Sequence, residues 1–116
     1  MRTIKFRGQP IDAANGMWVY GDLTHKGDKH SPCIRTVNNI YEYDVKPESV
    51  GQYTGLHDES GRGIYEGDRV LEDDDIGIVM WFSEGSQFVI EFDTFFEELS
   101  DSCNIDVIGN EMDGDL

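Results

Sequence analysis

Residues 50–70 read VGQYTGLHDESGRGIYEGDRV, and this stretch decides the fold of the chain. It contains five of the thirteen glycines, Gly51, Gly55, Gly61, Gly63 and Gly67. Glycine adopts positive φ at little cost, so such residues mark sharp turns and bulges. The polar run from Asp58 to Gly63 is typical of a turn. Arg69-Val70-Leu71 follows the corner Glu66-Gly67-Asp68 and reads as the start of a strand. The stretch therefore predicts hairpins of a small, strongly bent β-sheet or barrel.

The chain before this stretch alternates short apolar runs with turn signals, which predicts further strands. We expect strands at Thr3–Arg7 and Trp18–Tyr20, paired as a hairpin across the Asn15-Gly16 turn. The remaining elements expected here are an exposed loop at Thr24–Ser31, strands at Ile34–Val37 and Ile40–Val45 around an Asn38-Asn39 turn, and one helical turn at Pro47–Ser49.

The later half predicts a strand over Ile76–Phe82 that is apolar on both faces, as a central and well-covered strand is. A turn at Ser83–Ser86 leads to a partner strand carrying Phe88, Ile90 and Phe92. Residues Phe95–Leu99 form either a short helical turn or an irregular edge, and Ile105–Ile108 closes the sheet. We expect at least five strands and a core that includes Ile78, Met80, Phe88, Ile90 and Val107. The fold class is mainly β: a small antiparallel, partly open SH3-like barrel or bent sheet with little helix.

Several motifs together resemble the YopX family of phage and prophage proteins. They are Gln52-Tyr53-Thr54-Gly55-Leu56 with Asp58 and Gly61, Ile64-Tyr65-Glu66-Gly67-Asp68, Ile4-Lys5-Phe6-Arg7, Met17-Trp18-Val19-Tyr20-Gly21, Val45-Lys46-Pro47-Glu48-Ser49-Val50 and Val107-Ile108-Gly109-Asn110. The resemblance spans nearly the whole chain. It implies a mostly β domain of phage or prophage origin, and it implies no activity and no catalytic residues. The tail, residues 111–116, is more acidic than the usual continuation, and we expect it to be mobile.

Length and charge limit the classes of function. A chain of 116 residues predicts one domain over residues 1–116. The formal net charge of −15 repels phosphates, so we expect no direct nucleic-acid binding. We see no secretory segment and no apolar run of about 18 residues, so we expect no membrane association and a place in the cytoplasm of the bacterial host.

No residue pattern predicts a metal or cofactor site. Cys33 and Cys103 are far apart and are expected to be free thiols. His25 and His30 share a loop that no regular element supports, which argues against zinc. The carboxylates of Glu72–Asp75 could attract a hard cation, but a solvated hairpin tip is the simpler reading.

No pattern predicts catalysis either. Gly61-Arg62-Gly63 with Gly67 has the wrong spacing for a phosphate loop and precedes a strand rather than a helix. No serine lies in a nucleophile-elbow sequence. We therefore expect a non-enzymatic protein, with a small hydrolase or a metal-dependent enzyme as an alternative.

Aromatic residues supply the remaining hypothesis, because Tyr and Trp are enriched at binding surfaces. We expect Trp18 and Trp81 in the core. The candidate binding residues flank the glycine-rich hairpin and are Tyr53, Leu56, Arg62, Tyr65 and Glu66. An alternative is that Tyr65 and Leu56 only plug the end of a barrel.

The leading hypothesis for function is a phage- or prophage-derived accessory protein that binds another protein or a second copy of itself. An acidic mimic of nucleic acid, which would block a DNA-binding protein, is a further alternative.

Overall fold

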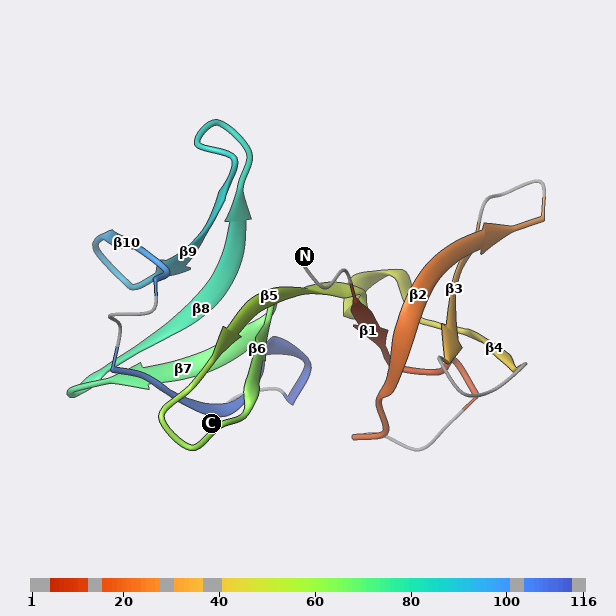
Figure 1. The fold of residues 1–116 in the computed structure, drawn as a ribbon, viewed down its shortest axis with the longest axis horizontal. Helices are drawn as coiled ribbons and strands as arrows, with labels where there is room; N and C mark the ends of the chain where they lie inside the picture. Colours follow the sequence, from red (N-terminus) through yellow and green to blue (C-terminus); the bar gives the residue numbers. More distant parts are fainter. Residues whose placement is uncertain (1–4, 13–15, 28–30, 37–40, 101–103, 114–116) are drawn as a thin grey trace. The chain divides into compact units, whose positions relative to one another are not determined.

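The computed structural model describes residues 5–12, 16–27, 31–36, 41–100 and 104–113. Short strands dominate these residues, together with two single-turn 3₁₀ helices (Figure 1). The elements are β1 (Phe6–Gly8), β2 (Val19–Lys26), β3 (Ser31–Thr36), β4 (Glu42–Asp44), η1 (Pro47–Ser49), β5 (Gly51–His57), β6 (Gly63–Tyr65), β7 (Asp68–Glu72), β8 (Asp75–Phe82), β9 (Gln87–Glu91), β10 (Phe96–Glu98), β11 (Asp106–Asn110) and η2 (Glu111–Asp113). Within this part of the chain no helix is long and apolar enough to cross a membrane.

The chain divides into two compact units, Met1–Tyr53 and Thr54–Leu116, which we describe separately. The expectation of a single domain over residues 1–116 stays a prediction.

The first unit is an antiparallel sheet in the order β4-β3-β2-β1, to which the first residues of β5 add. β2 and β3 form the long hairpin of this sheet, from Gly21 opposite Thr36 to Lys26 opposite Ser31. Its core consists of Val19, Ile34 and Val45, with Phe6, Leu23, Tyr43 and Val50 packed against them. The turn η1 is tied to this sheet because Ser49 Oγ accepts a hydrogen bond from the Gln9 N–H at 2.8 Å.

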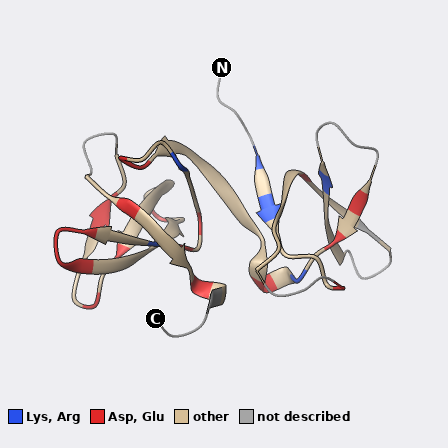
Figure 2. Cartoon of the chain, turned by 90° about the horizontal axis from the view of Figure 1, so that it is seen from below, with Lys and Arg blue, Asp and Glu red and all other residues tan. Residues whose placement is uncertain are grey.

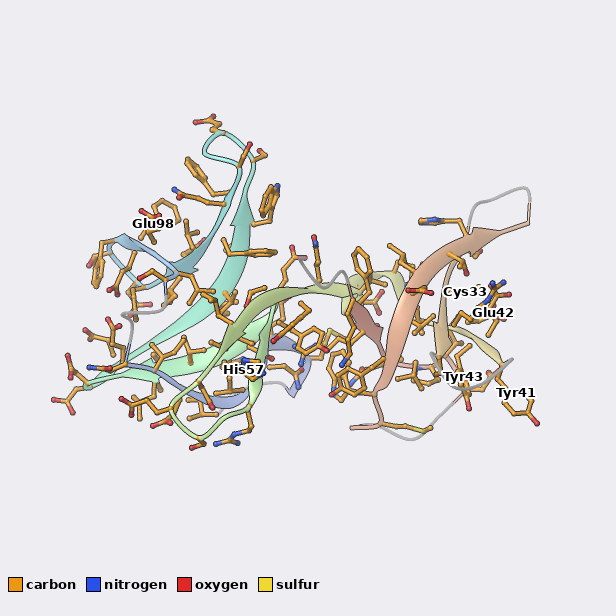
Figure 3. The ribbon with its side chains drawn as sticks, viewed as in Figure 1. Cys33, Tyr41, Glu42, Tyr43, His57 and Glu98 are labelled. Carbon is orange, nitrogen blue, oxygen red and sulfur yellow. The ribbon has the colours of Figure 1, made fainter. Side chains whose placement is uncertain are left out.

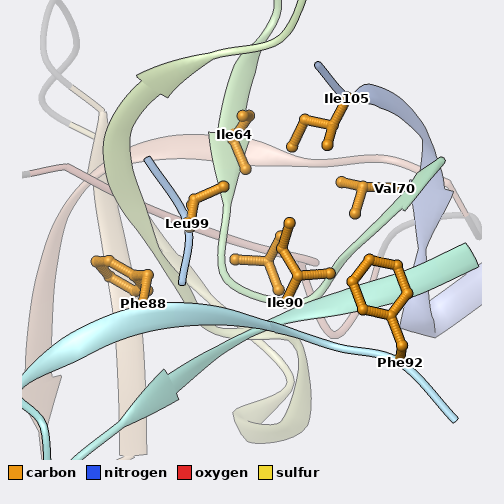
Figure 4. Close-up of a cluster of buried hydrophobic side chains, with 8 residues drawn as sticks. Ile64, Val70, Phe88, Ile90, Phe92, Leu99 and Ile105 are labelled. Carbon is orange, nitrogen blue, oxygen red and sulfur yellow. The ribbon is translucent and has the colours of Figure 1, made fainter. Parts of the chain in front are cut away.

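The second unit contains a five-stranded antiparallel sheet in the order β10-β9-β8-β7-β11. The rest of β5 pairs with β6 in this unit. Figure 4 shows the core that these strands enclose. Its members are Ile64, Val70, Val79, Phe88, Ile90, Phe92, Leu99 and Ile105, with Leu56 and Val107 packed against them.

The predicted fold class is confirmed, since the described chain is mainly β with two antiparallel sheets and little helix. Neither sheet closes into a barrel within the described residues. The helical turn at Pro47–Ser49, the β1–β2 hairpin and the closing strand β11 are also found as expected. Residues 95–99 were expected to form either a short helical turn or an irregular edge. The structure has an edge strand there, β10.

The expectation of an exposed loop at Thr24–Ser31 is wrong at both of its ends. Thr24, His25 and Lys26 continue β2, and Ser31 begins β3. Polar side chains are compatible with a strand when the ladder with its neighbour supplies the backbone hydrogen bonds. The expected turn residues Asn15, Asn38 and Asn39, the start of the first strand, His30 and Cys103 lie outside the described residues.

The expectation that β8 is covered on both faces is also wrong. Val79 is fully buried, whereas Ile78 is only half-buried and Met80 is exposed. Trp81, which we expected in the core, is also exposed. Phe88 and Ile90 are buried as expected, and Val107 is half-buried. One face of β8 packs on the core and the other faces solvent, so the apolar residues of the second face need a separate explanation.

Candidate functional site

The glycine-rich stretch is held by buried polar side chains that bond to the backbone. The Thr54 hydroxyl, on β5, donates to the carbonyl of Ile64 on β6 at 2.7 Å and accepts from the Leu56 N–H at 3.2 Å. Thr54 is buried, so these bonds satisfy its oxygen inside the hairpin. The role of this motif residue is architectural.

Asp58 organises the turn between β5 and β6. Its Oδ1 accepts hydrogen bonds from the N–H groups of Ser60 at 3.0 Å and Arg62 at 2.8 Å. Its Oδ2 accepts from the Val107 N–H at 2.9 Å and lies 3.4 Å from Arg62 Nε. Burial by itself raises the pKa of this carboxyl, but the three backbone N–H groups and the Arg62 guanidinium outweigh it, so the pKa is lowered overall. Asp58 thereby ties the turn to β11, 49 residues further along the chain.

The corner Glu66-Gly67-Asp68 is fixed in the same way. Asp68 is 1% exposed, and its Oδ2 accepts from the Tyr65 N–H at 2.8 Å. Gly67 has φ of 92°, donates to the Val79 carbonyl and accepts from the Glu111 N–H, both at 2.8 Å. The predicted left-handed turn at Gly67 is confirmed, and η2 at the start of the acidic tail is attached to it.

The five predicted binding residues do not form one exposed surface. Tyr65 is only 5% exposed, and Leu56 packs against the core. Tyr53 belongs to the first unit and is half-buried, as is Glu66 in the second. Arg62 alone among the five is exposed, with 61% of its side chain accessible. Tyr65 is buried and Leu56 is partly buried, while the alternative that these two residues plug the end of a barrel stays a prediction.

A groove of about 750 Å³ lies on the solvent-facing side of the second unit's sheet. Its floor is formed by Ile76, Ile78 and Met80, the alternate residues of β8. Ile78 lies opposite Arg69 on β7 and opposite Glu91 on β9, so these three side chains share one face. Ile76 is 49% exposed and Met80 40% exposed, which places apolar surface in contact with solvent.

One wall of the groove is the turn between β9 and β10. Phe92, Asp93, Thr94 and Phe95 all line it. The rings of Phe92 and Phe95 stack with their centroids 4.7 Å apart, and the Phe92 N–H donates to the Phe95 carbonyl at 2.9 Å. Phe92 is buried while Phe95 is 49% exposed, so the buried ring supports the exposed one. This contact gives the wall a fixed shape.

The groove is strongly acidic. Its lining includes one guanidinium, that of Arg69, and five carboxylates, those of Asp74, Asp75, Glu91, Asp93 and Glu111. Arg69 Nε donates to the Asn110 carbonyl at 3.3 Å, which directs part of the guanidinium toward β11. Figure 2 shows Asp and Glu residues in red at the turns and on the strands of both units, in keeping with the net charge of −15.

Sequence reasoning missed this site because β8 is apolar at odd and even positions alike. The informative signal lies in the neighbouring strands. Val70 and Ile90 share the face of Val79, whereas Arg69 and Glu91 share the face of Ile78. The charged residues opposite Ile78 on both neighbouring strands therefore identify the outward face at that position, once the register is known.

A smaller hollow of about 330 Å³ lies in the first unit, lined by Pro10, Asp12, Met17, Glu42, Tyr43 and Asp44. Figure 3 labels Glu42 and Tyr43 on β4 and Cys33 on β3. Glu42 accepts from Thr24 Oγ1 at 2.7 Å and from Arg35 at 3.3 Å. The Cys33 thiol donates to Asp44 Oδ1 at 3.2 Å. These contacts join β4 to both β2 and β3, so they explain the local packing.

The remaining acidic side chains bear on metal binding and acid–base chemistry. No group of three or more His, Cys, Asp or Glu in that part of the chain is arranged to hold a metal ion. The run Glu72–Asp75 forms the tip of the β7–β8 hairpin, as expected: Glu72 ends β7, Asp73 and Asp74 form the turn, and Asp75 begins β8. Glu72 also forms a carboxyl–carboxylate hydrogen bond with Glu97. This bond, together with burial and the charges of Glu97, Asp73 and Asp75, raises the pKa of Glu72 to about 7.

Comparison with known proteins agrees with this architecture. The chain matches no curated protein. The family model described as "YopX protein" matches residues 5–112, which include the strands of both units and the whole of the glycine-rich stretch. The chain therefore belongs to the YopX family.

Proposed function

We propose that this protein acts by binding another protein through the groove on the outer face of its second sheet. The observation that carries the proposal is the apolar row of Ile76, Ile78 and Met80 beside the exposed ring of Phe95. Ile76 and Met80 are exposed and Ile78 is half-buried. Contiguous apolar surface costs free energy in water, and soluble proteins commonly keep such surface for partners. A groove of this volume falls within the range of ligand and peptide sites.

Further apolar side chains in the same unit support a recognition surface. Phe82 and Phe96, exposed by 37% and 63%, stack with ring centroids 6.3 Å apart. Aromatic side chains bury a large area for few rotatable bonds, which makes them effective in binding.

The floor of the groove lies directly against the core. Gly77 lies between two floor residues, and a Cβ there would come within 2.5 Å of Ile90 Cγ2 and 3.0 Å of Phe92. The close approach of β8 to these core side chains holds the floor against the core. A preorganised surface loses little conformational entropy when it binds.

The wider role that we propose is a phage- or prophage-derived accessory protein that works in the bacterial cytoplasm as a binding module rather than as an enzyme. Membership of the YopX family supports the phage or prophage origin. The binding role rests on the groove and on the exposed aromatic residues Phe82 and Phe96 of the same unit.

The test is affinity capture from bacterial lysates, with and without phage infection, using three immobilised proteins. They are the wild type, the groove variant Ile76→Ser/Met80→Ser and the control variant Ile11→Ser/Met17→Ser. The control replaces one isoleucine and one methionine of similar exposure, 53% and 45%, in the first unit.

We expect a protein that the wild type and the control both retain and that the groove variant loses. Sedimentation velocity on the same three proteins would reveal a second copy as the partner. Identical captured proteins and identical sedimentation for all three would contradict the proposal.

A further inference from the structure

We infer that the groove recognises a basic amphipathic segment, in which apolar side chains face β8 while lysine or arginine side chains reach the carboxylates around it. This inference rests on the proposed function and adds the chemical class of the partner. It follows from the combination of an apolar floor with an acidic margin.

The floor selects apolar side chains at regular spacing. Ile76, Ile78 and Met80 lie on one face of β8, so neighbouring side chains are about 6.5 Å apart along the strand. An extended partner segment repeats its own side chains at the same interval. Burial of each apolar contact stabilises the complex in proportion to the area removed from water.

The margin selects positive charge. Asp74 lies in the turn from β7 to β8 and Asp75 begins β8, Asp93 lies in the turn from β9 to β10, and Glu111 follows β11. Glu91 lies on β9, directly opposite the floor residue Ile78. All five carboxylates are exposed, so each is available to a cation without a large desolvation cost. An acidic groove also accelerates encounters with a basic partner at low salt.

The charge argues against the other occupants. A second copy of this chain carries the same net charge of −15, so long-range repulsion opposes self-association through this face. Nucleic acid is repelled for the same reason. A neutral apolar segment would contact the floor but would form no ion pair with the five carboxylates.

The test measures binding of three synthetic peptides of about eight residues, the length of a strand that spans β8. They alternate leucine with lysine, leucine with glutamine, and glutamine with lysine. Fluorescence anisotropy of labelled peptides gives Kd for four proteins, each first shown by circular dichroism and urea unfolding to remain folded. The four are the wild type, Ile76→Ser/Met80→Ser, Glu91→Gln/Asp93→Asn and the control Asp22→Asn/Glu48→Gln. The control removes one Asp and one Glu charge from exposed positions of the first unit.

We expect the leucine–lysine peptide to bind the wild type and the control equally, within about twofold. The groove charge variant should weaken binding about five- to tenfold, in line with two exposed ion pairs, and the apolar variant should weaken it at least as much.

Two outcomes would overturn the inference, and they differ in what they mean for the proposed function. If the leucine–glutamine peptide binds as tightly as the leucine–lysine peptide and only the apolar variant weakens it, the groove binds protein segments but does not select basic ones. If the glutamine–lysine peptide binds as tightly as the leucine–lysine peptide and both charge variants weaken binding equally, the attraction is unspecific. The proposed function then also loses its support.

Discussion

Replacement of Asp58 by alanine tests whether the glycine-rich stretch is an architectural device. The carboxylate accepts hydrogen bonds from the backbone N–H groups of Ser60, Arg62 and Val107, at 2.8 to 3.0 Å. Its side chain is fully buried, with 0% accessible. A hydrogen bond to a charged acceptor contributes about 1.5–3 kcal/mol, and the three are not independent. We therefore expect Asp58→Ala to lower the free energy of unfolding of the second unit by about 3–5 kcal/mol.

Two matched variants separate the carboxylate from its ion pair. Asp58→Asn keeps an oxygen for the Ser60 and Arg62 N–H groups but turns an amide N–H₂ toward Val107, so we expect about half of the loss. Arg62→Ala removes only the guanidinium at 3.4 Å, whose side chain is 61% exposed, so the loss should be within about 1 kcal/mol.

The assay is urea unfolding at neutral pH in a Trp18→Phe background, which leaves Trp81 as the fluorescent reporter of the second unit. Because the pKa of Asp58 is lowered on folding, its contribution is present at neutral pH and is lost as the pH falls through the folded pKa. The Asp58→Ala variant should thus show a smaller loss of stability on acidification than the wild type. A loss of stability below about 1 kcal/mol for Asp58→Ala would refute the reasoning. A loss for Arg62→Ala as large as that for Asp58→Ala would refute it too.

Three further predictions concern the corner, the carboxyl pair and the net charge. Gly67→Val should lower the free energy of unfolding by about 1–3 kcal/mol, because φ is 92° there and a β-branched residue is strained at that angle. Steric contact should add little, since the atom nearest to the new Cβ would be Glu111 Oε1 at 3.3 Å, at the end of a flexible side chain. Gly67→Asn is the control with a smaller expected loss, and a melting temperature of Gly67→Val equal to the wild type would contradict this prediction. The pKa of Glu72 is raised from 4.5 to about 7 on folding, chiefly by its bond to Glu97, so the native state holds the extra proton. The unfolding free energy should therefore fall as the pH rises from about 4.5 to about 7, by an amount that solvent screening keeps on the order of 1 kcal/mol. Glu72→Gln should remove this dependence of the unfolding free energy on pH, as measured by urea unfolding at several pH values. An unchanged pH dependence would count against the proton shared by Glu72 and Glu97. Random duplex DNA should not be retained at physiological salt because the net charge is −15, and a micromolar Kd in a filter-binding assay would reopen the nucleic-acid class.

Local chemistry explains which parts of the fold the sequence could predict. Gly67, in the polar corner after Glu66, can adopt positive φ at little cost, and the alternation of Phe88 and Ile90 marked one buried face of a strand. Such features depend on neighbours within a few residues along the chain, so backbone sterics and periodicity are sufficient to predict them. The polar β2–β3 hairpin was missed because its stability comes from pairing across the ladder rather than from the propensity of Thr24, His25 and Lys26.

The role of the glycine-rich stretch could not be predicted in this way. The same glycine-rich stretch that carries the family resemblance proves to be held together by Thr54, Asp58 and Asp68, whose side chains bond backbone groups up to 49 residues away. The sequence suggested a binding hairpin because it shows residue types and not their burial.

The sequence by itself determined that this chain forms antiparallel β structure with tight glycine turns and an acidic surface, because these properties follow from local conformation and from counting charges. Only the tertiary structure decided which apolar residues are covered. Ile76, Ile78 and Met80 are as apolar as Val79, and they differ from it only in the face of the sheet on which they lie. That face is chosen by the register with β7 and β9 and by the side on which the core assembles, and neither can be read from β8 alone.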